Sequence, residues 1–138
     1  RKLVVHRKGA TRAFPANRDE IPTKYRHLGQ PVLVPGSMGT ASWILLGQPN
    51  SMDLSFGSTA HGAGRTMSRS KARRNYTEND VKKSLNDKGI FIKALTRDGV
   101  VEETPQAYKD VDSVVDVSHN LGIATKVAKL VPIGVIKG

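Results

Sequence analysis

The chain has 138 residues, a formal net charge of +10 and no cysteine. This length suits a single domain, and the lack of cysteine excludes a disulfide framework and any cysteine-ligated zinc site within these residues. No apolar run approaches the roughly 18 residues that a membrane-spanning helix needs, and no signal peptide is visible, so we expect a cytoplasmic protein without a membrane partner.

The positive charge is concentrated in the first half of the chain. Residues 1–76 contain 13 Lys and Arg against three acids, whereas residues 77–138 contain nine of each sign. Such an asymmetry favours an anionic partner, and nucleic acid is the commonest one. The alternative is a basic surface that serves only solubility.

The pattern of apolar residues in the first half of the chain predicts short strands separated by irregular segments. Apolar runs bounded by glycine or proline predict strands at residues 3–6, 31–34 and 41–46. Residues 36–39 form the expected turn between the last two strands. Residues 47–60 are rich in Gly, Ser, Pro and Asn and are expected to form a loop.

A helix is expected over residues 64–75, because it would place Arg65, Arg69 and Arg73 on one face. A stripe of charge on a helix is usually a solvated face. Here the stripe would continue directly from a histidine-containing turn, so a phosphate-facing role is the open alternative.

The rest of the chain mixes strands and helices, which predicts the α+β class. Thr77 with acids in the following turn has the pattern of a helix N-cap. The other expected elements are strands at 91–95 and 100–102 joined by a turn at 97–99, a helical turn at 105–108, a helix from 111 to about 122, and a strand over 124–136.

The segment 56–69 is the strongest candidate for chemistry. His61 lies among Gly57, Gly62 and Gly64, and Arg65 follows. Glycines let another molecule approach the backbone closely, a neutral imidazole can act as a nucleophile near pH 7, and arginine binds phosphate. These parts suit a histidine that reacts at phosphorus, although a histidine in a glycine-rich turn is more often a surface or packing residue.

Two further patterns concern anions and metals. The turn that contains Gly36 and Ser37 could hold an anion with its N–H groups and hydroxyl, or it could be an ordinary β-turn. The four histidines, at positions 6, 27, 61 and 119, are too far apart in sequence for a local metal motif. No complete metal site is therefore expected in this chain.

Four segments resemble the RtcB-type RNA ligases. They are residues 6–15, 35–42, 61–69 and 132–138. These motifs are long and ordered, and the resemblance extends over essentially the whole chain. It implies that residues 1–138 are the C-terminal segment of a larger single catalytic domain, with a mixed or antiparallel sheet and a few helices. The metal-binding half of that domain would lie outside this chain.

The resemblance also implies a GTP- and manganese-dependent activity that joins an RNA 3′-phosphate or 2′,3′-cyclic phosphate to a 5′-hydroxyl, as in tRNA splicing and RNA repair. By motif position, His61 would be the nucleophile that takes GMP from GTP. The implied guanylate contacts are Pro35, Gly36, Ser37, Met38, Ser42, Ala63, Gly64, Tyr108 and Lys137. The residues expected to hold RNA phosphates are Lys8, Arg12, Arg65 and Arg69.

The expected partners are RNA, such as tRNA exon halves, and the missing N-terminal part of the same protein. The Mn²⁺ ligands are expected outside this chain, so the chain alone should be inactive. The competing hypothesis is a non-catalytic basic RNA-binding module, in which the same loops contact phosphate and His61 does no chemistry.

Overall fold

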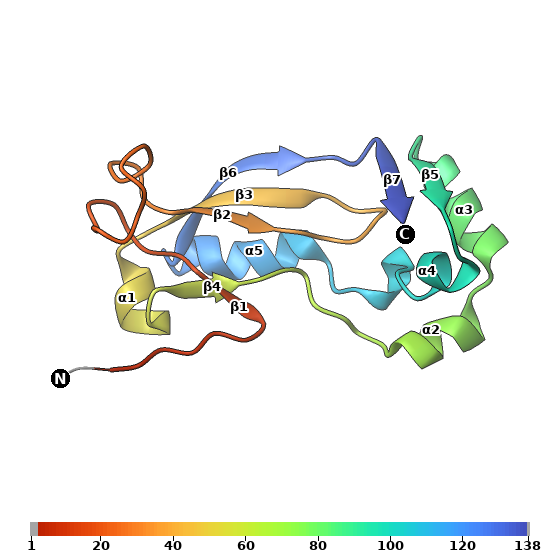
Figure 1. Cartoon of the computed structure of the whole chain (residues 1–138), viewed down its shortest axis with the longest axis horizontal. Helices are drawn as coiled ribbons and strands as arrows, with labels where there is room; N and C mark the ends of the chain where they lie inside the picture. Colours follow the sequence, from red (N-terminus) through yellow and green to blue (C-terminus); the bar gives the residue numbers. More distant parts are fainter. Residues whose placement is uncertain (1–2, 138) are drawn as a thin grey trace.

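A computed structural model describes residues 3–137, which form two lobes side by side (Figure 1). The first lobe is built on a three-stranded antiparallel sheet with the order β2-β3-β6. Its strands are β2 (Pro31–Val34), β3 (Ser42–Gly47) and β6 (Ala124–Leu130), and helix α5 (Val111–Asn120) packs against it. Val32 and Val34 of β2 are buried, whereas the two residues that alternate with them are exposed, so one face of this strand packs on the core.

The first lobe is completed by a small antiparallel pair and a short helix. Strand β1 (Ala10–Arg12) pairs with β4 (Ser58–Ala60), so that Ala10 lies opposite Ala60. Helix α1 (Asn50–Ser55) precedes β4. The core of this lobe consists of small and β-branched side chains, namely Ala13, Val32, Val34, Ala41, Leu45, Ala63, Val111, Val115 and Ala124.

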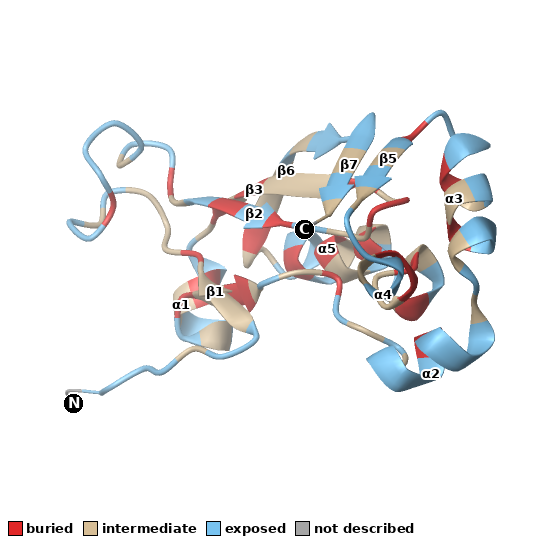
Figure 2. Ribbon diagram, turned by 45° about the vertical axis from the view of Figure 1, so that its right-hand side comes forward, coloured by how far each residue is buried: buried red, intermediate tan, exposed pale blue. Residues whose placement is uncertain are grey.

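The second lobe combines helices with a two-stranded parallel sheet. Its elements are α2 (Arg69–Asn75), α3 (Glu78–Asn86), α4 (Arg97–Val101), β5 (Phe91–Ala94) and β7 (Gly134–Lys137), and a 3₁₀ turn, Pro105–Ala107, leads back to the first lobe. One face of the sheet packs on a second core of Met38, Val81, Leu85, Ile90 and Val100. Figure 2 shows much of the opposite face of β5 and β7 exposed.

Most of the expected elements are confirmed, together with the α+β class. The strands at 31–34, 41–46 and 91–95 agree with β2, β3 and β5 within one residue. The expected N-cap of α3 is a full capping box, because Thr77 accepts a hydrogen bond from the Asp80 N–H and the Asp80 carboxylate accepts one from the Thr77 N–H.

Two predictions near the N-terminus are wrong. Residues 3–6 are not a strand, and Val4 is 97% exposed with no partner strand beside it. Residues 47–60 are not a loop, because they contain α1 and β4. The buried Ser51 hydroxyl of α1 donates to the Ala13 carbonyl at 2.7 Å. These contacts join residues distant in sequence, so local composition does not reveal them.

The strand expected at 100–102 is a helix. Thr96 caps α4 by accepting from the Gly99 N–H at 3.2 Å. Val100 and Val101 are consecutive and both buried, which a strand with one solvent face does not allow. The turn expected at 97–99 is therefore the first turn of α4.

The helix expected over 64–75 begins only at Arg69, with Ser68 as its N-cap. Gly64 has φ +76°, and the Thr66 N–H donates to the Ala107 carbonyl at 2.7 Å, so residues 64–66 lie extended beside 107–109. The strand expected over 124–136 is divided into β6 and β7 around Pro132, where proline removes a ladder donor.

Candidate active site

His61 follows directly on β4 and is exposed. The next residues lie against the β2–β3 turn, because the Ala63 N–H donates to the Pro35 carbonyl at 2.9 Å. A Cβ on Gly62 would lie 3.2 Å from the same oxygen, closer than almost all real Cβ contacts. The absence of a side chain at Gly62 thus lets the histidine loop approach the turn closely.

The β2–β3 turn is closed by hydroxyl groups. The Thr40 Oγ1 accepts from the Ser37 N–H at 2.8 Å and lies 3.0 Å from the Ser37 Oγ. A Cβ on Gly36 would lie 2.1 Å from the Ala41 carbonyl oxygen, so only glycine fits there. The ordinary β-turn interpretation accounts for these bonds, and an anion contact at the turn stays a prediction.

A third segment lies beside the histidine loop. The Lys109 N–H donates to the Gly64 carbonyl at 2.9 Å, and Arg65 forms a β-bridge with Tyr108. The Arg65 guanidinium stacks 4.9 Å from the centre of the Tyr108 ring and donates to its hydroxyl at 3.0 Å. Three of the implied guanylate contacts therefore lie close together, namely Ala63, Gly64 and Tyr108.

The Arg65 guanidinium is held by several hydrogen bonds to groups of the same chain. Its Nη2 donates to the Glu102 carbonyl at 2.6 Å, its Nε donates to the Met67 carbonyl at 3.0 Å, and its Nη1 lies 3.3 Å from the Glu103 Oε1. The side chain is only 22% exposed. These contacts give Arg65 a positioning role, and contact with an RNA phosphate stays a prediction.

Arg69, also expected to hold an RNA phosphate, is more accessible than Arg65. Its side chain is 62% exposed, and its Nε lies 3.5 Å from a carboxylate oxygen of both Glu102 and Glu103. Arg73 also pairs with Glu102. The three arginines do not share one helix face as expected, since Arg65 precedes α2, but they converge on the same two acids.

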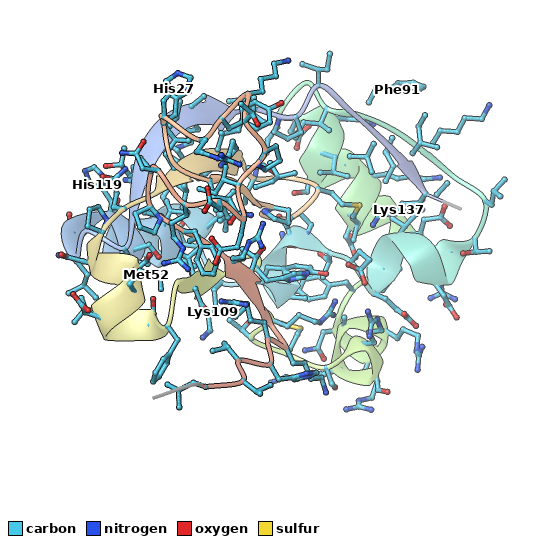
Figure 3. The ribbon with its side chains drawn as sticks, turned by 60° about the vertical axis from the view of Figure 1, so that its left-hand side comes forward. His27, Met52, Phe91, Lys109, His119 and Lys137 are labelled. Carbon is cyan, nitrogen blue, oxygen red and sulfur yellow. The ribbon has the colours of Figure 1, made fainter. Side chains whose placement is uncertain are left out.

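Lys137 lies on β7, at the far end of the chain. Strand pairing places Lys137 opposite Ala94, and Figure 3 labels it on β7. Its positive charge acts on the Glu103 carboxylate. Contact between Lys137 and guanylate stays a prediction.

The remaining predicted residues are more dispersed. Ser42 begins β3 opposite Leu130, and Met38 is buried in the second core. Arg12 donates to the Gln30 Oε1 at 2.8 Å. Lys8 is exposed two residues before β1, at the end of the β1–β4 pair from which His61 follows β4.

Glu103 is the important residue that the sequence analysis missed. Its carboxylate accepts from the Tyr108 hydroxyl and pairs with Arg65. The signal that could have identified it is the adjacent acid pair Glu102–Glu103 in a chain whose excess of arginine lies upstream. The expected strand at 100–102 obscured that signal.

The pKa values of Glu103 and Tyr108 are both shifted from their ordinary values. Burial of Glu103 opposes ionisation, but the hydrogen bond from Tyr108 and neighbouring cations outweigh it, so the pKa of Glu103 lies below its ordinary value. Those cations are Lys137, Arg65 and Arg69. Burial, and then the hydrogen bond and negative charge of Glu103, raise the pKa of Tyr108.

We expect a bell-shaped dependence of stability on pH. A lowered pKa for Glu103 stabilises the fold above the unfolded value of about 4.3, and this stability is lost as the pH falls through the lower folded value. A raised pKa for Tyr108 stabilises it below the unfolded value of about 10, and this stability is lost as the pH rises through the folded value. Urea titrations of Glu103→Gln at a series of pH values should show that the free energy of unfolding changes less steeply with pH on both the acidic and the alkaline side. Unchanged slopes would contradict this interpretation.

Within the described residues 3–137, no group of three His, Cys, Asp or Glu side chains lies close enough to hold a metal ion. None of the described helices is both long and apolar enough to cross a membrane.

Comparison with known proteins decides the family. The family described as tRNA-splicing ligase RtcB matches residues 1–138. The chain belongs to the RtcB family. Similar proteins, each named tRNA-splicing ligase RtcB, come from Nanoarchaeum equitans, with 56% identity over 99% of this chain, and Aeropyrum pernix, with 57% identity over 100%. The Pyrobaculum aerophilum protein of the same name is 55% identical over 100%.

The chain spans under a third of the length of these RtcB relatives. It covers 29% of the Nanoarchaeum equitans protein and 28% of the other two.

Proposed function

We propose that this chain is the C-terminal segment of an RNA ligase and carries its nucleophile and most of its guanylate site. The enzyme uses GTP to join an RNA 3′-phosphate or 2′,3′-cyclic phosphate to a 5′-hydroxyl, as in tRNA splicing and RNA repair. The observation that carries the proposal is the accessible imidazole of His61 on a loop hydrogen-bonded to Pro35. Membership of the family named tRNA-splicing ligase supports the reaction class.

The first step is a transfer of GMP. A neutral His61 nitrogen attacks the α-phosphorus of GTP, a P–N bond forms, and the P–O bond to pyrophosphate breaks. A 2′,3′-cyclic end is first opened by water, which breaks the P–O2′ bond and leaves a 3′-phosphate. In the second step an oxygen of the RNA 3′-phosphate attacks the same phosphorus and the P–N bond breaks. In the third step the RNA 5′-hydroxyl loses its proton, attacks the 3′-phosphate, and displaces GMP.

The neighbouring segments supply positioning rather than chemistry. A Cβ at Gly64 would meet nothing within 4 Å, so the loop leaves open space beside His61 for a nucleotide. Tyr108 offers a ring face near this space, and the ammonium group of Lys137 suits a carbonyl oxygen of guanine. Glu103 holds Tyr108 and Arg65 in place.

Manganese needs ligands from another part of the protein, because the described residues offer no group that could hold a metal. When bound, such an ion acts as a Lewis acid on phosphoryl oxygens. We place its ligands in the portion of the RtcB protein that this chain does not span, and we infer a cytoplasmic enzyme that acts on tRNA exon halves.

The test is a sealing assay with the full-length protein. An RNA with a 3′-phosphate and an RNA with a 5′-hydroxyl should be joined only when GTP and Mn²⁺ are both present, and the chain of residues 1–138 alone should join none. RNA binding that is strongly salt-dependent, without sealing and without a response to GTP, would instead support a non-catalytic RNA-binding module.

A further inference from the structure

A cleft of about 640 Å³ lies in the first lobe, away from Tyr108 and Lys137. Aromatic, aliphatic and cationic side chains share its walls. They are Leu3, Val5, Arg7, Phe14, Arg18, Met52, Asp53 and Phe56. Figure 3 labels Met52 on α1, which forms one wall. A cleft of this size can hold a nucleotide-sized ligand.

Three guanidinium groups surround the ring of Phe14 in this cleft. Arg18, Arg12 and Arg7 lie 4.5, 5.0 and 5.6 Å from the ring centre. Asp53 is the single acid in the wall. Glu20, which lies outside the wall, pairs with Arg18 at 2.6 Å. The three arginines thus face two acids, and the remaining positive charge suits the backbone of a nucleic acid.

Phe56 is presented to the cleft in an unusual conformation. It is 61% exposed and has φ +52°, a left-handed geometry that a bulky side chain seldom adopts. The Arg7 Nη2 donates to its carbonyl at 3.0 Å, and the Gly57 N–H donates to the Ser51 carbonyl at 2.7 Å. Phe56 is the C-cap of α1, so the left-handed conformation ends that helix and fixes where the ring emerges.

The cleft is connected to the proposed reaction centre by a short length of chain. Phe56 is followed by β4 and then by His61. Five residues span at most roughly 18 Å. An RNA strand whose end lies at His61 can therefore place a nucleotide near its end in the cleft.

We propose that this cleft, which we call the Phe14–Phe56 cleft, binds single-stranded RNA close to the 3′-phosphate that reacts at His61. An unpaired base stacks on Phe56, and Arg7 faces a backbone phosphate, the arrangement by which aromatic and arginine side chains bind unpaired nucleotides. This inference rests on the proposed ligase function, and it adds a site for the substrate strand beyond the guanylate contacts.

The test compares Phe56→Leu with Phe56→Tyr in the full-length protein. Leucine keeps an apolar side chain at the strained position but removes the ring, whereas tyrosine keeps it. For a longer single-stranded RNA with a 3′-phosphate, Phe56→Leu should bind about 5- to 100-fold more weakly, while Phe56→Tyr binds like the parent. Binding of a dinucleotide with the same end should not change in either variant.

Phe91→Leu is the matched control, because Phe91 is an aromatic side chain that is 71% exposed on β5 in the other lobe. Its RNA affinity should equal that of the parent. Unchanged RNA affinity in Phe56→Leu, as expected if the rest of the protein fills the cleft, overturns the proposal, and so does an equal loss in Phe56→Tyr.

The GMP adduct separates this proposal from the ligase function itself. It forms from GTP and Mn²⁺ without RNA, so Phe56→Leu should gain label as fast as the parent. A parent protein that gains no label refutes the ligase function. A parent that gains label, combined with an unchanged RNA affinity in Phe56→Leu, refutes only the cleft.

Discussion

Replacing His61 with asparagine is expected to abolish the GMP adduct of the full-length protein and to lower RNA sealing by a factor on the order of 10³ or more. Asparagine keeps a polar side chain of similar size in an exposed loop, so the fold should be unaffected. It has no nitrogen lone pair free to attack phosphorus. The measurement is incorporation of radiolabelled GMP from GTP in the presence of Mn²⁺.

His27→Asn is the matched control for this variant. His27 is also exposed, on the long connection between β1 and β2, and its substitution should leave both adduct and sealing unchanged. An adduct that survives in His61→Asn would move the nucleophile to another side chain. Loss in both variants would indicate a general effect of removing imidazole.

Replacing Leu85 with alanine is expected to lower the free energy of unfolding by about 2–5 kcal/mol. Leu85 lies on the inner face of α3, is fully buried, and belongs to the core that includes Met38. Val135 of β7, two residues before Lys137, packs against the same core. The cavity left by the substitution would thus lie beneath two segments of the proposed guanylate site.

A functional consequence should accompany the loss of stability. Because Leu85 supports both the β2–β3 turn and β7, we expect a raised KM for GTP at temperatures where the variant is still folded. Equilibrium unfolding in urea and the dependence of guanylylation on GTP concentration measure the two effects. Leu95→Ala is the control, since Leu95 is 81% exposed, and it should change stability by less than about 0.5 kcal/mol.

Patterns within short stretches of sequence predicted much of the fold. The strands at 31–34 and 41–46 and the capping box at Thr77 are confirmed, because alternation and capping depend on neighbours in the chain. Elements whose stability comes from distant partners were missed. Strand β4 exists through its pairing with β1, and α4 through the burial of Val100 and Val101.

In the candidate site, too, features set by neighbours in the chain were predicted and features set by distant contacts were not. Glycines around His61 are visible in the sequence, and the structure brings their loop into contact with Pro35 and Tyr108. The contacts to guanylate that the family resemblance implied stay a prediction. The role of Glu103 was not visible. Its importance depends on Tyr108 and Arg65 both binding its carboxylate, and their positions in the sequence do not indicate these contacts.

The most direct test of the central claim is to identify the atom that carries GMP. Full-length protein is incubated with GTP and Mn²⁺ without RNA, digested under neutral conditions, and the modified peptide is sequenced by mass spectrometry. GMP on His61, stable in base and released by acid as a phosphoramidate should be, is the predicted result. GMP on a lysine or on another histidine, or no modified peptide at all, would contradict it.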